Sequence, residues 1–116
     1  MKPGSTADAA LLAHMRECVA RIREYTGGER AQFDASRLVQ DAVVRNLQTL
    51  TEASQRLSDA IKDSEPGVRW RELAGFRNVI VHGYLGLDLA VVWTVVEHDL
   101  PPLAAALERM ATRSEP

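Results

Sequence analysis

Three side chains that could act on a phosphate lie within six positions of one another. They are Arg77, Asn78 and His82, and Tyr84 follows two residues later. A guanidinium supplies a fixed positive charge to a phosphate, an amide can position its neighbours, and an imidazole transfers protons near neutral pH. The apolar residues around Arg77 recur at helical spacing and place it in the middle of an apolar arc. A charge there needs a carboxylate, a phosphate or a wet cleft, because burying it unpaired is costly.

Each of these residues also has a purely structural interpretation. Arg77 could form a buried ion pair or extend its head to solvent. His82 could interact with the end of a helix, and Tyr84 could close the edge of the core. The spacing alone leaves both interpretations open.

A second polar pair precedes this segment. Arg45 and Glu52 are seven residues apart, so they share one face of a predicted helix. That face is either solvated or part of a cleft beside Arg77. In the second case Glu52 provides the carboxylate that a buried arginine requires.

The composition predicts one small globular domain. The chain has 116 residues, 46% apolar and 26% charged, with a net charge of −2. We expect a single domain with its core at about residues 8–112 and short flexible termini. The acidic balance counts against broad electrostatic binding of nucleic acid. The stretch from Arg69 to His82 nevertheless has three arginines against one glutamate, which favours a focused basic site confined to that helix.

The sequence offers little for metal or disulfide chemistry. Cys18 is the single cysteine, and His14 and His98 are expected at the surface, so we predict no metal site. No apolar run reaches the length of a signal peptide or a membrane span, and we expect a cytoplasmic protein.

Helical periodicity extends along most of the chain. One helix is predicted from Asp8 to Gly27-Gly28, and a second, of roughly thirty residues, from Asp34 to Pro66-Gly67. A third is predicted from Arg69 to His82.

The C-terminal part is predicted as two further helices. Leu89–Val96 is rich in β-branched residues, but no other segment could pair with it as a strand, so we predict a short buried helix capped by Asp88. Pro101 and Pro102 are expected at the start of the last helix. The fold class is therefore all-α, an antiparallel bundle of four to five helices.

The string Gly-Phe-Arg-Asn-Val-Ile-Val-His-Gly-Tyr at residues 75–84 resembles the Arg-x4-His-x-Tyr signature of HEPN-domain toxins of the HepT-like family. Weaker matches flank it, at residues 41–53 and 92–101. One difference is Thr51, where the family often has glycine before the second-helix glutamate.

This resemblance implies a metal-independent endoribonuclease without a cofactor, acting as a homodimer whose two motifs face one cleft. Arg77 would bind the scissile phosphate, His82 would act as general acid or base, and Asn78 would orient one of them. The family's antitoxin is an MNT-type nucleotidyltransferase that transfers AMP to the tyrosine corresponding to Tyr84. The implied partners are thus RNA, this antitoxin and a second copy of the chain.

Two functional classes remain open at this point. The first is a ribonuclease toxin of a type II toxin–antitoxin pair. The second is a non-catalytic HEPN module that binds a nucleotide or a nucleotidyltransferase as a scaffold. An intact Arg77 and His82 favour the first.

Overall fold

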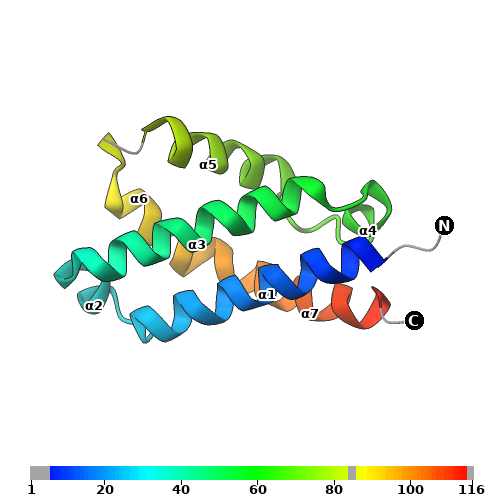
Figure 1. Ribbon diagram of the computed structural model, residues 1–116, viewed down its shortest axis with the longest axis horizontal. Coiled ribbons are helices and arrows are strands. Elements are labelled where there is room, and N and C mark those ends of the chain that lie inside the picture. Colours follow the sequence, from blue (N-terminus) through cyan, green and yellow to red (C-terminus); the bar gives the residue numbers. More distant parts are fainter. Residues whose placement is uncertain (1–5, 84–85, 115–116) are drawn as a thin grey trace.

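The computed structural model describes residues 6–83 and 86–114, and these form helices and no strand. The helices in chain order are α1 (Thr6–Thr26), α2 (Arg30–Ala35), α3 (Arg37–Arg56), α4 (Asp59–Asp63), α5 (Trp70–Gly83), α6 (Leu89–Thr94), the π-helical turn η2 (Val95–Asp99) and α7 (Leu100–Ser114). The all-α prediction is confirmed (Figure 1). No helix among the described residues is both long and apolar enough to cross a bilayer.

The first helix ends at the predicted glycine pair. Gly27 and Gly28 have φ of 60° and 75°, in the left-handed region that favours glycine. The Gly27 amide donates to the carbonyl oxygen of Arg23 at 2.8 Å, which closes the last turn of α1.

The predicted second helix is wrong in its length, because two serines divide it. Ser36 has extended backbone geometry and its hydroxyl accepts from the Val39 amide, so α3 starts anew after α2. Ser58 caps α4 in the same way, accepting from the Ile61 amide. Side-chain capping satisfies amides that a helix start leaves unpaired, so each serine ends one helix and begins another.

The break before α4 is stabilised by a residue of α1, which lies 50 positions earlier in the sequence. The buried Asp8 carboxylate on α1 accepts from both the amide and the hydroxyl of Ser58, at 2.9 and 2.6 Å. Periodicity within residues 34–65 gives no information about this contact.

The C-terminal helices join through a π-helical turn. Asp88 caps α6 as predicted, accepting from the Ala90 amide at 2.9 Å. Pro101 and Pro102 lie in the first turn of the last helix, as predicted. This helix starts at Leu100 and is continuous with α6 through η2. Pro101 and Pro102 have no amide hydrogen for an α-helical bond, and a π-helical turn is one way to accommodate such a gap.

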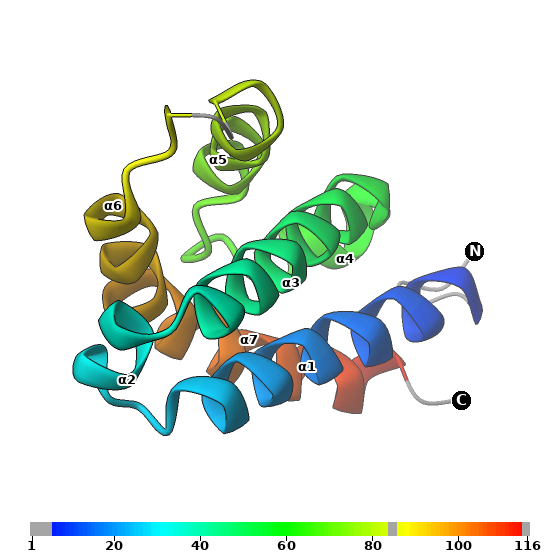
Figure 2. The same cartoon turned by 60° about the vertical axis from the view of Figure 1, so that its left-hand side comes forward.

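The core lies between α1, α3 and α7, and α5 packs on its outer side. Helices α1 and α7 contact each other, and α3 contacts both α1 and α5. Figure 2 shows α5 lying against α3 and away from α1. Ile80 is the one buried residue of α5, whereas α1 and α3 each bury seven. The third predicted helix is thus confirmed to within one residue at each end, but it is the least buried of the long helices among the described residues.

Candidate active site

The start of α5 is fixed by the loop that precedes it. The indole Nε1 of Trp70 donates to the carbonyl oxygens of Lys62 and Glu65, both at 3.2 Å. These contacts tie the first turn of α5 to the end of α4.

Glu65 connects this loop to α7. Its side chain is 8% exposed, and Arg109 donates to both carboxylate oxygens through Nε and Nη2. Arg113 adds a further contact, from its Nη2 to Oε2 of Glu65 at 2.6 Å. The hydrogen bonds from Arg109, followed by those from Arg113, lower the pKa of Glu65 to about 2, against the opposing effect of burial. The three side chains hold α4, the following loop and α7 together.

Arg77 is held between two oxygen acceptors. Its Nη2 lies 3.3 Å from Oε2 of Glu52 on α3, and its Nη1 donates to Oδ1 of Asn78 at 3.3 Å. The Arg77 side chain is 31% exposed, and its buried Nε finds no hydrogen-bond partner among the residues that the structure describes. Arg77 is therefore neither a fully buried core residue nor a free surface cation. One part of the guanidinium is fixed and another part faces solvent.

His82 lies in the last turn of α5 and is exposed. Its side chain forms no hydrogen bond or ion pair with any other residue in the described ranges. Five helical residues separate it from Arg77, which is about 140° around the helix and about 7.5 Å along its axis. The two side chains therefore point in different directions, and Asn78 contacts Arg77 rather than His82. Tyr84, the predicted modification site, lies outside the described residues.

Arg45 does not join this contact. It is exposed on α3, two turns before Glu52, and lines a groove together with Gln48. Of the two predicted second-helix residues, the structure brings Glu52 to Arg77 and leaves Arg45 without an ion pair among the described residues.

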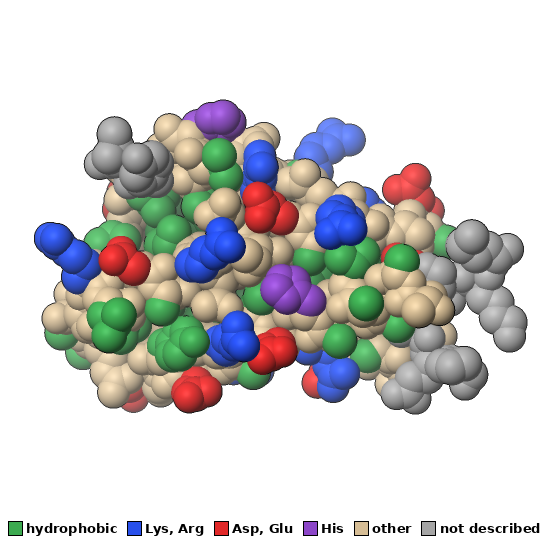
Figure 3. All heavy atoms as spheres, in the orientation of Figure 1, with side chains coloured by type: hydrophobic (Ala, Val, Ile, Leu, Met, Phe, Trp, Pro, Cys, Tyr) green, Lys and Arg blue, Asp and Glu red, His purple; other side chains and the backbone are tan. Residues whose placement is uncertain are grey.

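The positive charge near the site is distributed differently from the sequence-based expectation. Arg69, just before α5, faces Glu72 at 3.7 Å, and Arg77 on α5 pairs with Glu52, so both positive charges are partly compensated. Within the described ranges, the arginines of α3 have no carboxylate within ion-pair distance; they are Arg37, Arg45 and Arg56. Figure 3 shows basic side chains at intervals over α3 and α5 with acidic ones among them. The available positive charge thus extends beyond α5 onto α3.

The remaining histidines and the cysteine lie away from Arg77. His14 and His98 are exposed on α1 and η2. Cys18 is buried, its Sγ is 3.4 Å from Oγ1 of Thr49, and burial raises the pKa of the thiol. In residues 6–83 and 86–114, no group of three or more His, Cys, Asp or Glu could hold a metal ion.

Two contacts that position the site were not predicted from the sequence. The ion pairs of Glu65 with Arg109 and Arg113, here called the Glu65 clamp, join residues 44 or more positions apart. The hydrogen bonds between Asp8 and Ser58 join residues 50 positions apart. The sequence shows only a glutamate before Pro66-Gly67, and nothing in it indicates that Glu65 is buried and therefore needs a cationic partner.

Comparison with known proteins identifies the family. The chain matches the family described as "Ribonuclease HepT-like" over residues 15–110. It is 32% identical to the "Probable ribonuclease HepT" of Thermococcus cleftensis over 100 residues, which covers 85% of this chain and 91% of that protein. It is 26% identical to the "mRNA nuclease HepT" of Shewanella oneidensis, covering 77% of this chain and 84% of that protein. No solved structure gives a significant match. The family match over most of the chain, with the Arg-x4-His sequence on an exposed helix within it, shows that this protein belongs to the HepT-like ribonuclease family.

Proposed function

We propose that this protein is a metal-independent endoribonuclease and the toxin of a type II toxin–antitoxin pair, acting in the cytoplasm. The observation that carries the proposal is the state of Arg77. Its guanidinium is oriented by Glu52 and Asn78 and remains partly open to solvent, on the same helix as an exposed histidine. This arrangement suits a cation that must meet a phosphate, since a preorganised charge needs no rearrangement during the reaction.

In the proposed reaction the RNA 2′-hydroxyl attacks its own 3′-phosphate. A base takes the proton of that hydroxyl, the new P–O2′ bond forms, and the P–O5′ bond breaks. An acid then gives a proton to the departing 5′-oxygen. Arg77 stabilises the negative charge that grows on the phosphate, and His82 performs a proton transfer. The products are a 2′,3′-cyclic phosphate and a 5′-hydroxyl.

The two side chains are proposed to act across a homodimer. Within one chain Arg77 and His82 point in different directions, so a second copy is a simple way to bring a histidine toward an arginine. The partly exposed apolar surface of α5 supports such a contact, because Val79 is 50% exposed and Ile80 alone is buried in that helix.

We further propose that the toxin is silenced at Tyr84. An MNT-type nucleotidyltransferase would transfer AMP from ATP to the tyrosine hydroxyl, releasing pyrophosphate. Tyr84 is two residues from His82, so the added phosphate would place negative charge where RNA must approach.

The alternative is a non-catalytic scaffold that binds a nucleotide or a nucleotidyltransferase. One observation favours it, namely that an ion pair such as that of Arg77 with Glu52 also occurs in purely structural settings.

The deciding experiment incubates the purified chain with RNA in the presence of EDTA and identifies the new termini. We expect cleavage with 2′,3′-cyclic phosphate ends, and loss of cleavage in Arg77→Ala and His82→Ala.

Size-exclusion chromatography with light scattering should give the mass of two chains. Mixing the two inactive variants then tests the composite cleft, because a mixed dimer holds one intact set of residues. RNA left intact by the wild-type chain would favour the scaffold, and a monomer would remove the shared cleft.

A further inference from the structure

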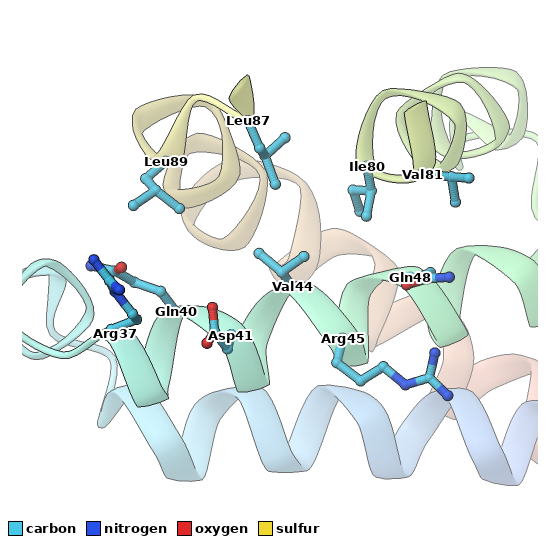
Figure 4. Close-up of a pocket in the computed structure, with 10 residues that line it drawn as sticks. All are labelled: Arg37, Gln40, Asp41, Val44, Arg45, Gln48, Ile80, Val81, Leu87 and Leu89. Carbon is cyan, nitrogen blue, oxygen red and sulfur yellow. The ribbon is translucent and has the colours of Figure 1, made fainter. Parts of the chain in front are cut away.

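A groove of about 940 Å³ lies between α3, the C-terminal half of α5 and the start of α6. Figure 4 shows apolar side chains pointing into it from all three elements: Val44 from α3, Ile80 and Val81 from α5, and Leu87 and Leu89 around the start of α6. Its size is within the range of sites that bind small organic ligands, and such sites combine an apolar lining with a few polar groups.

The rim of the groove holds polar groups without partners. The side-chain amide of Gln48 makes no hydrogen bond to another described residue. The side chain of Gln40 is fixed, because its Nε2 donates to the backbone carbonyl oxygens of Phe33 and Asp34 on α2. Arg37 and Arg45 form no ion pair in the described ranges, although Asp41 lies four residues from each. In Figure 4 both arginines extend away from the apolar floor. The groove thus has an apolar interior, one available amide and two available cations outside it.

The groove lies beside the candidate active site, although neither Arg77 nor Glu52 lines it, because Val81 is one helical turn after Arg77 on α5. Gln48 precedes Glu52 by four residues, about 6 Å along α3. On the opposite wall, Val81 directly precedes His82. A chain molecule whose phosphate lies at Arg77 would therefore reach the groove with its neighbouring unit.

We propose that this groove binds an unpaired nucleotide of single-stranded RNA next to the cleaved phosphate. The base lies on the apolar floor, its polar edge meets the Gln48 amide, and the flanking phosphates lie near Arg37 and Arg45. A base can enter only if it is unstacked and unpaired, which selects single strands, loops and ends over duplex RNA. This inference deepens the proposed ribonuclease function and rests on it.

The charge of the rim favours RNA over a second copy of the chain as occupant. The rim carries two arginines against one carboxylate, Asp41, so a symmetric contact through this groove would bring two rims of net positive charge together. A polyanion compensates them instead.

The test uses the wild-type chain and 2′-O-methyl RNA octamers, which cannot be cleaved because the attacking hydroxyl is blocked. Binding is measured by fluorescence anisotropy for the single strand, its duplex, and a series with one abasic residue at each position. We expect about tenfold weaker binding at one abasic position, because the missing base no longer packs on the aliphatic floor or contacts the Gln48 side-chain amide. The duplex should bind more weakly than the single strand.

Two variants test the rim, and each has a matched control. Gln48→Ala and Arg45→Ala should weaken binding of the intact octamer by about three- to tenfold. Gln55→Ala on α3 and Arg23→Ala on α1, both exposed and outside the groove, should leave it within about twofold.

The outcomes separate this inference from the proposed function. Cleavage of RNA by the wild-type chain, together with equal binding of all abasic octamers and of both rim variants, would overturn the groove proposal alone. A rim variant that changes the oligomeric mass would identify the groove as a contact between copies and also overturn it. Position-specific loss of octamer binding without any RNA cleavage would support the groove and refute the nuclease.

Discussion

Glu52 on α3 and Arg77 on α5 are joined by an ion pair of 3.3 Å across 25 residues of sequence. Both side chains are about one-third exposed, at 37% and 31%, so the pair contributes little to stability. Its proposed effect is to orient the guanidinium.

Removing this carboxylate should therefore affect RNA cleavage more than folding. For Glu52→Gln we expect about a tenfold lower kcat, because a misplaced cation stabilises the transition state less well. The free energy of unfolding should change by less than about 1 kcal/mol. Glu72→Gln is the matched control, because Glu72 faces the exposed Arg69 at 3.7 Å on the same helix. Equal kcat values for the two variants would show that Glu52 does not position Arg77.

The second prediction concerns the histidines. His82→Ala should lower the cleavage rate by about 10²- to 10⁴-fold, the usual contribution of a general acid or base. His82 is exposed, so the melting temperature should stay unchanged. His98→Ala is the control, since His98 is also exposed and its side chain lies 3.2 Å from Oε1 of Glu97, away from α5 in the sequence. A fully active His82→Ala variant would exclude this residue from the proton transfers.

The third prediction is a pH dependence of stability from Glu65. Its folded pKa of about 2 lies below the ordinary value of 4.5, so the carboxylate stabilises the fold above about pH 5 and loses this effect as the pH falls toward 2. With screening of the half-exposed Arg109, we expect a loss of about 2 kcal/mol over that window.

Urea unfolding of the wild type and of Glu65→Gln at pH 7 and pH 3 measures this effect. Other carboxylates titrate in both proteins, so the difference between the two curves isolates Glu65. The variant should be less stable than the wild type at pH 7, the difference should be smaller at pH 3, and it should nearly vanish as the pH approaches 2. A constant difference at all pH values would contradict the proposed role of the charge.

The fourth prediction concerns Cys18. The thiol is 2% exposed and its pKa is raised by burial, so little reactive thiolate is available at neutral pH. The native chain should react with a thiol reagent such as DTNB at least about 100-fold more slowly than the chain in urea, because reaction then requires opening of the fold. Fast reaction of the native protein would show that α1 and α3 separate easily at Thr49.

The sequence predicted the elements whose ends are encoded locally. Gly27-Gly28 ended α1 as predicted, because a left-handed backbone there favours glycine. Asp88 capped α6, because its acceptor reaches an amide two residues away. Such signals operate within one turn of chain and can be read from the order of residues.

The predictions from sequence were wrong or incomplete where residues far apart in the sequence determine a helix boundary or a contact. The interruption at Ser58 depends on Asp8, and periodicity continued smoothly through it because Leu57 and Ile61 are both buried. The π-helical turn η2 likewise lets α6 and α7 remain one continuous helix despite two prolines. At the candidate site, helical spacing alone placed Arg77 on an apolar arc. It left two interpretations open for Glu52, either a solvated residue or the carboxylate partner of Arg77. The packing of α5 on α3 brings the two together.

The shallow burial of α5 has a thermal consequence. Ile80 is the one fully buried residue of α5, and Trp70, Leu73 and Phe76 pack on the core while only partly buried. The amides of α5 should therefore exchange with solvent through local opening before those of α1 and α3. Warming would then detach the helix that carries Arg77 and His82 while the three-helix core persists. Enzymatic inactivation would precede global melting.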